Sequence, residues 1–83
     1  MQKILFDARE LEHPQPLEKG VKHLLEMDED SYLYMIHRKN PLPLLKMAEE
    51  RAYQTLSHED KNGIWHILIS KTEKIDLKAL LDV

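Results

Sequence analysis

The chain of 83 residues carries one short pattern twice, because Pro-x-Pro-Leu occurs at positions 14–17 and again at 41–44. Each copy follows an apolar run typical of a strand and precedes an amphipathic run typical of a helix. Proline is favoured in the first turn of a helix, since its ring fixes φ near the helical value and its missing N–H would have no intrahelical acceptor there. The repeat therefore predicts two strand–loop–helix units.

Four segments are predicted as strands: 4–6, 32–37, 53–57 and 64–70. The first is a short apolar run that indicates a buried strand, and the second has apolar residues at both parities, which favours a central strand. In the predicted strand 64–70, successive side chains face opposite sides of the sheet. One face carries Trp65, Ile67 and Ile69, and the other carries His66, Leu68 and Ser70. Residues 58–63 contain Asn-Gly and predict a turn that joins the last two strands as an antiparallel hairpin.

The first helix is predicted to begin at Pro16 and to bury one apolar stripe. That stripe is Leu17, Val21, Leu24 and Leu25. Gly20 lies inside this helix, where it costs about 1 kcal/mol relative to Ala, and close packing of the helix on a strand is the favoured explanation. The second helix is predicted to open at Pro43 with Asn40 as a cap. Its inner face is Leu44, Leu45, Ala48 and Ala52.

The element order is β-α-β-α-β-β. Right-handed crossovers place both helices on one face of the sheet. The last strand can insert between the second and third, which gives a four-stranded mixed sheet of order 1-2-4-3. The predicted fold is α+β, a two-layer sandwich of residues 1–71 with the other sheet face open. Residues 72–83 form a tail with a short helix, capped by Asp76, that we expect to dock on its own domain.

A candidate ligand or partner site lies where the first two strands end. If these strands are neighbours, their carboxyl ends bring the loops 8–16 and 37–43 together, and both helix N-termini point at the same place. The candidate residues are Arg9, Glu12, His13, Pro14, Pro16, His37, Arg38, Lys39 and Pro43.

Three interpretations of this edge stay open. The helix N-termini and basic side chains could hold a phosphate, a carboxylate or an acidic peptide. His13 and His37 could instead bind a metal, with Glu12 or Asp7 as a third ligand. The third interpretation is structural, with the carboxylates paired to Arg9 and Arg38 and the imidazoles bonded to backbone groups.

Composition excludes several functions. The absence of cysteine excludes thiolate metal sites and cysteine nucleophiles, and two glycines are too few for a glycine-rich phosphate loop. No serine has a nucleophile-elbow setting, so we expect no enzymatic activity and no cofactor.

The net charge of −3 makes nucleic acid an unlikely partner, although Tyr32, Tyr34 and Trp65 could stack bases on the open sheet face. No signal peptide or bilayer-spanning run is visible, so we expect a cytoplasmic protein that does not enter a membrane.

The chain resembles the TusA/SirA-type sulfur-carrier proteins. The resemblance rests on Phe6-Asp7-Ala8-Arg9 and on Leu11-Glu12-His13-Pro14-Gln15-Pro16-Leu17. With the segments 37–45 and 63–67, it looks closer still to an uncharacterised, cysteine-less bacterial branch of that superfamily. Members of the branch occur alone or beside hemerythrin-like domains. The resemblance covers residues 4–71 and implies the same β-α-β-α-β-β sandwich.

One departure from the sulfur carriers changes the functional expectation. Their Cys-Pro-x-Pro motif is matched here by His13-Pro14-Gln15-Pro16, and imidazole cannot form the persulfide that a thiolate forms. The resemblance therefore implies a binding or regulatory module that engages a protein partner, or a small anionic or metal-containing ligand, at the His13/His37 edge. Two alternatives remain: an accessory in sulfur or redox metabolism that uses His13 for proton or metal handling, and RNA binding through the open sheet face.

Overall fold

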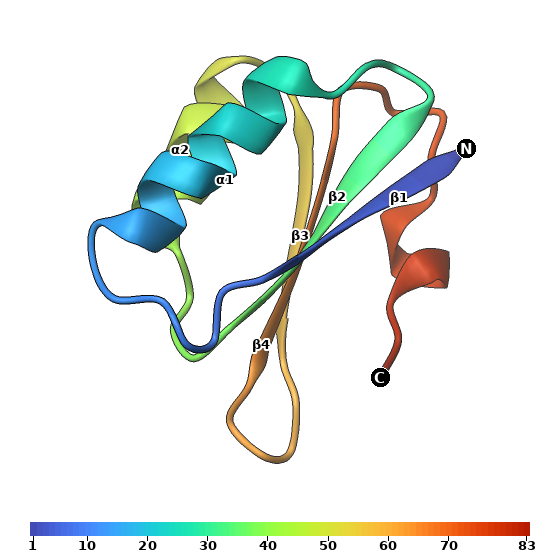
Figure 1. Cartoon of the computed structure of the whole chain (residues 1–83). Coiled ribbons are helices and arrows are strands. Elements are labelled where there is room, and N and C mark those ends of the chain that lie inside the picture. The colour runs from blue at the N-terminus through green and yellow to red at the C-terminus, as the bar shows by residue number, and fades with distance from the viewer.

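The computed structural model describes all 83 residues as one small sandwich (Figure 1). Its sheet has the order β1-β2-β4-β3, with β1 parallel to β2 and with β4 antiparallel to both of its neighbours. The predicted α+β class, element order and strand order are therefore confirmed. The elements are β1 (Gln2–Asp7), α1 (Gln15–Glu26), β2 (Ser31–His37), α2 (Leu42–Glu50), β3 (Gln54–Glu59), β4 (Trp65–Ser70) and the 3₁₀ helix η1 (Leu77–Leu80).

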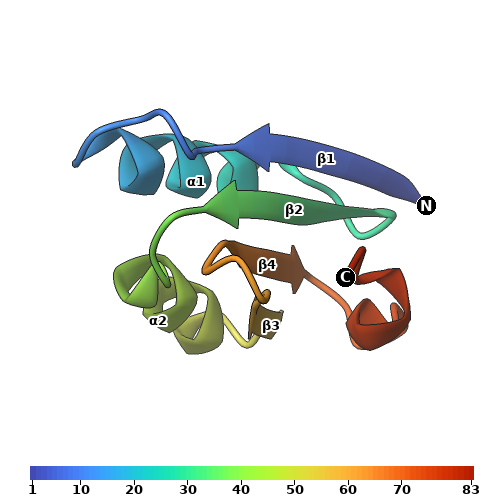
Figure 2. The ribbon, with the colours of Figure 1, turned by 90° about the horizontal axis from the view of Figure 1, so that it is seen from below.

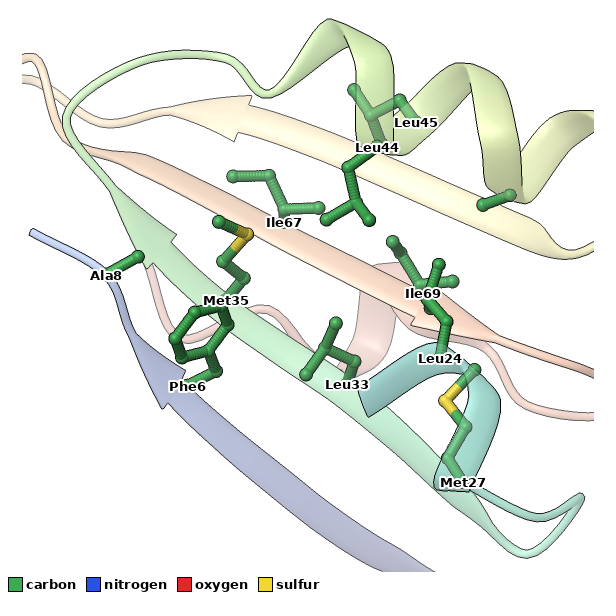
Figure 3. Packing of buried hydrophobic residues seen from close by; sticks show 11 residues of the cluster. Phe6, Ala8, Leu24, Met27, Leu33, Met35, Leu44, Leu45, Ile67 and Ile69 are labelled. Atoms are coloured by element: carbon green, nitrogen blue, oxygen red, sulfur yellow. The ribbon is translucent and has the colours of Figure 1, made fainter. Parts of the chain in front are cut away.

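Both helices lie on one side of the sheet and the C-terminal tail lies on the other (Figures 1 and 2). The main core fills the space between the sheet and the helices, as Figure 3 shows. Alternate residues of the two central strands point into it, because successive side chains of a strand face opposite sides. The strand contribution is Leu33, Met35, Ile67 and Ile69, all fully buried.

Gly20 explains how closely the two helices approach. A Cβ atom placed on Gly20 would lie 2.8 Å from Cδ2 of Leu44 in α2, a distance that real Cβ contacts do not reach. The prediction of close packing is therefore confirmed, but the partner is the second helix and not a strand. The contact lies one turn beyond the start of α1, so it holds the beginnings of the two helices together.

The tail covers the central part of the second face of the sheet, so the prediction of an open face is wrong there. Ile75 and Leu77 are buried against Tyr32, Tyr34 and Leu68, which confirms that the tail docks on its own domain. The aromatic residues are not available to stack bases, since Tyr32 and Tyr34 lie under the tail and Trp65 packs on the helical side.

Polar contacts fasten the tail at both of its ends. The Gln54 side-chain amide donates to the Ile75 carbonyl at 2.6 Å, and the Ser70 hydroxyl donates to the Thr72 carbonyl at 2.7 Å. Near the C-terminus, Lys3 Nζ lies 2.8 Å from Asp82 Oδ2. The sheet face beneath the tail is therefore an internal surface of the fold.

Two predictions of burial are wrong for geometric reasons. Leu5 points away from the helices because successive side chains of a strand face opposite sides, and on the edge strand β1 it remains 60% exposed. In α1 the inner face is rotated relative to the predicted stripe, because Pro16, Gly20 and Leu24 face the core while Leu25 is 60% exposed. Because Gly20 has no side chain, α2 can approach α1 closely on the face of α1 that carries Gly20.

The predicted helix starts and caps also differ in detail. α1 begins at Gln15, one residue before Pro16, and α2 begins at Leu42. The amide oxygen of Asn40 does not cap α2, because it accepts a hydrogen bond from the Ser57 hydroxyl at 2.7 Å. Asp76 precedes η1 and makes no side-chain cap bond either.

Two element boundaries in the second half of the chain differ as well. Ala52 lies beyond α2 with φ of 61°, so it is exposed and not on the inner face of that helix. β3 extends to Glu59, so His58 belongs to the strand and not to the turn. None of the helices has the length and hydropathy that a bilayer-spanning segment needs.

Candidate functional site

The candidate site lies at the edge of the sheet where β1 and β2 end. These strands run in parallel, with Asp7 opposite Ile36, so the loops that follow them leave the sheet side by side. Both helices begin at this same end of the molecule (Figure 1). A pocket of about 270 Å³ opens between the two loops. The predicted residues that line it are Glu12, His13, Pro16, His37, Arg38, Lys39 and Pro43.

Two of the predicted residues, Arg9 and Pro14, do not line the pocket. Arg9 is engaged by Asp7, since its Nε lies 2.9 Å from Oδ1 and its Nη2 lies 2.7 Å from Oδ2. These side-chain hydrogen bonds, with help from the Arg9 backbone N–H, lower the pKa of Asp7 to about 2. Asp7 and Arg9 therefore satisfy each other, as the structural interpretation expects for this pair.

Arg38 joins the two loops across the pocket. Its Nη2 donates a hydrogen bond to the Leu11 carbonyl at 3.2 Å and lies 3.7 Å from Oε1 of Glu12. The Glu12 side chain is 85% exposed, and exposed pairs at such distances contribute little to stability. Arg38 is therefore held mainly by the backbone carbonyl, and its charge stays available to a ligand.

His37 is the buried polar group of the pocket. It ends β2 on the same face as Leu33 and Met35, so its ring points to the helical side and is 8% exposed. Its Nδ1 is buried and has no hydrogen-bond partner. Burial lowers the pKa of His37, and the charges of Arg38 and Lys39 lower it further. The ring is therefore neutral near pH 7, and a buried polar atom without a partner costs about 1–3 kcal/mol.

The pocket holds two of the residues proposed as metal ligands, His13 and His37. No group of three or more histidine, aspartate or glutamate side chains in the chain is arranged to hold a metal ion. A metal bound here would therefore need further ligands from outside the protein.

Sequence reasoning missed a second polar cluster, on the face covered by the tail. The Tyr34 hydroxyl lies 2.8 Å from Nδ1 of His66, and Nε2 of His66 lies 2.9 Å from Oδ2 of Asp60. The backbone N–H of Asp82 donates to the Tyr34 oxygen at 3.0 Å. The hydrogen bond from His66 is the main cause that lowers the pKa of Asp60.

The sequence carries one signal of this cluster, which is that Tyr34 and His66 lie on the same face of neighbouring strands. Their partners Asp60 and Asp82 come from the turn and the tail, whose positions depend on tertiary packing. All the polar atoms of the cluster find partners within the chain, which is typical of a structural network.

Comparisons with known proteins define the class of the protein. A crystal structure of a SirA-like protein from Desulfitobacterium hafniense superposes with a TM-score of 0.71 at 28% sequence identity, covering 83% of this chain and 97% of that one. The fold is therefore a SirA-like two-layer sandwich, as the resemblance implies.

The family model described as "Uncharacterized conserved protein (DUF2249)" matches residues 5–71, and the chain belongs to this family. No curated protein matches the chain.

Proposed function

We propose that the protein is a small, non-enzymatic binding module whose pocket between the starts of α1 and α2 receives a small ligand or a side chain of a partner protein. The observation that carries this proposal is the ring of His37, which lines the pocket, is buried, and lacks a partner for Nδ1. Buried polar groups are nearly always hydrogen-bonded in folded proteins, so a ligand that completes this bond would account for the exception.

The character of the pocket agrees with a binding role. Its volume of about 270 Å³ lies just below the range of about 300–1,000 Å³ typical of small-molecule pockets, so its ligand is small or is a single group of a larger partner. The charges of Arg38 and Lys39 and the two helix N-termini favour an anionic group. Sulfur transfer is not part of the proposal, because the chain has no cysteine.

The proposal is tested by nuclear magnetic resonance titration of the ¹⁵N-labelled full chain with three sets of small compounds: anionic, neutral and cationic. An acidic peptide serves as the probe for a partner protein. We expect at least one set to cause saturable shifts of the amides of the loops 8–16 and 37–43. Arg38→Ala should weaken that response, while Lys61→Ala, in the distant β3–β4 turn, should leave it unchanged.

Native mass spectrometry of the protein purified without chelator or affinity tag provides the complementary measurement. A bound adduct that is lost in His37→Leu would support the pocket as its place of binding. If no compound set and no peptide shifts the two loops, and the purified protein carries no adduct, the proposal is overturned.

A further inference from the structure

The first turn of α1 leaves one backbone donor without an acceptor. The N–H groups of a first helical turn have no intrahelical partner. In α1, Pro16 has no N–H, and the Gln15 N–H donates to the Glu12 carbonyl at 2.9 Å. The regular hydrogen bonds between residues four apart begin with the Glu18 N–H, which donates to the Pro14 carbonyl at 3.1 Å. The Leu17 N–H is left without a hydrogen bond.

The first turn of α2 has the same arrangement. Pro43 has no N–H, the Leu42 N–H donates to the Asn40 carbonyl at 2.9 Å, and the Leu45 N–H donates to Pro41 at 3.0 Å. The Leu44 N–H is therefore the single first-turn donor of this helix that has no acceptor. The repeated Pro-x-Pro-Leu pattern thus gives each helix one available N–H, at the leucine of the motif.

The fold brings the two residues that carry these donors to one pocket. Leu17 and Leu44 both line the pocket that contains His37. The contact between Gly20 and Leu44 keeps α1 and α2 close just beyond their first turns. A helix N-terminus carries the equivalent of about half a positive charge, so two of them converge on the pocket beside Arg38.

We infer that the pocket is an oxyanion site in which the Leu17 N–H, the Leu44 N–H and the His37 ring bind the phosphoryl group of a small organic phosphate. The inference rests on the proposed function and names its ligand class. The unpartnered, buried His37 ring is an observation independent of the two helix starts. Arg38 and Lys39 supply the compensating positive charge, and Glu12 is exposed enough to turn away from Arg38 when an anion arrives.

The origin of the donors in three different elements favours a phosphoryl group over a carboxylate. The donors come from three elements around the pocket: the start of α1, the start of α2 and the end of β2. A phosphoryl group presents three oxygens tetrahedrally, whereas a carboxylate presents two oxygens in one plane. The apolar wall formed by Leu11, Leu17 and Leu44 leaves room for a small organic portion attached to the phosphate.

The experiment is a titration of the ¹⁵N-labelled full chain with inorganic phosphate, and separately with acetate, at constant ionic strength set by chloride. We expect the Leu17 and Leu44 amide signals to move together and to saturate with one dissociation constant that is lower for phosphate than for acetate. Replacing leucine 17 by its α-hydroxy acid converts that N–H into an ester oxygen while the side chain stays. This change should weaken phosphate binding roughly fivefold to tenfold, the effect of losing one hydrogen bond.

The His37→Leu variant provides a second test that does not depend on the backbone. It should weaken phosphate binding by a similar factor, because it removes the ring donor and leaves both helix starts in place. Acetate that binds as tightly as phosphate would overturn the phosphoryl assignment. Shifts confined to Arg38 and Lys39 would overturn the inference, since they would indicate surface attraction of the anion without the backbone donors.

The two proposals fail in different ways. If neutral compounds shift the pocket amides while phosphate does not, the phosphate site is overturned and the proposed binding role of the pocket is supported. If phosphate and every other compound leave the pocket amides unchanged, both the phosphate site and the binding role are overturned.

Discussion

The two buried histidines of this small protein differ in their hydrogen bonds. His37 and His66 are each 8% exposed and lie on opposite faces of the same sheet. Both ring nitrogens of His66 have partners, Tyr34 and Asp60, whereas Nδ1 of His37 is buried without a partner and the residue lines a pocket. The comparison separates a histidine whose hydrogen bonds are complete within the chain from one whose buried Nδ1 has no partner there.

The largest expected effect concerns stability. His66→Leu leaves the Tyr34 hydroxyl and the Asp60 carboxylate without their partner, so we expect it to reduce the free energy of unfolding by about 2–3 kcal/mol. His37→Leu removes a buried, unsatisfied nitrogen and breaks no hydrogen bond, so we expect it to leave the free energy of unfolding unchanged or to raise it by up to about 1–3 kcal/mol. Urea denaturation of both variants measures the difference, and equal losses would contradict the distinction drawn between the two histidines.

The next effect concerns the helix contact that shapes the pocket. In an exposed helix Gly→Ala would stabilise by about 1 kcal/mol, but at Gly20 the new methyl group meets Leu44 at 2.8 Å. We expect Gly20→Ala to destabilise the protein by about 1–3 kcal/mol, as overpacking does.

A double-mutant cycle provides the control for this prediction. Leu44→Ala opens the space that the new methyl group needs, so the double variant should lose less stability than the sum of the two single variants. Strictly additive losses would show that the Gly20–Leu44 contact does not set the helix approach. Ring signals of His66 should remain unchanged, since its cluster lies on the other face of the sheet.

The third effect concerns the charge beside His37. Arg38→Ala should weaken phosphate binding roughly tenfold, as expected for one charge-assisted hydrogen bond. Glu12→Gln should act in the opposite direction and tighten binding by less than about fivefold, because the pair that it breaks is exposed. Isothermal titration calorimetry measures both changes, and weaker binding in Glu12→Gln would contradict the competition between Glu12 and the anion.

The smallest effect concerns pH. The pKa of His37 is lowered in the folded protein, so below its ordinary value of 6.5 the unfolded chain binds a proton that the folded chain does not. The contribution of the neutral His37 to stability is therefore fully present above pH 6.5, and it declines as the pH falls from 6.5 to the lowered pKa of His37. Denaturation between pH 5 and pH 7.5 should show a shallower slope in His37→Leu than in the unsubstituted protein. Identical slopes would contradict the lowered pKa.

The sequence was sufficient to predict the fold because its strongest signals are local. The two Pro-x-Pro-Leu copies indicate the helix starts, and the alternation in β4 assigns its two faces. A helix between β1 and β2 makes these strands parallel, and right-handed crossovers place both helices on one face of the sheet. The same reasoning placed His13, His37 and Arg38 at one edge, and the structure places them around one pocket.

The errors arise where tertiary contacts determine whether a side chain is buried and which group it bonds. Leu25 has the spacing of a core residue, but α2 approaches α1 on the side of Gly20 and leaves Leu25 in solvent. Asn40 has the chemistry of a cap, but the Ser57 hydroxyl of β3 occupies its oxygen. Whether a buried nitrogen such as Nδ1 of His37 has a partner depends on the final packing, and no sequence pattern reports it.

The most direct measurement records the ring nitrogen resonances of His37 and His66 in one spectrum while inorganic phosphate is added at constant ionic strength. We expect the His37 ring signals to shift and to saturate at the dissociation constant of the Leu17 and Leu44 amides, while the His66 signals stay in place. Unchanged His37 signals at phosphate concentrations that saturate the two amides, or equal movement of both histidines, would contradict the assignment of His37 to the phosphate site.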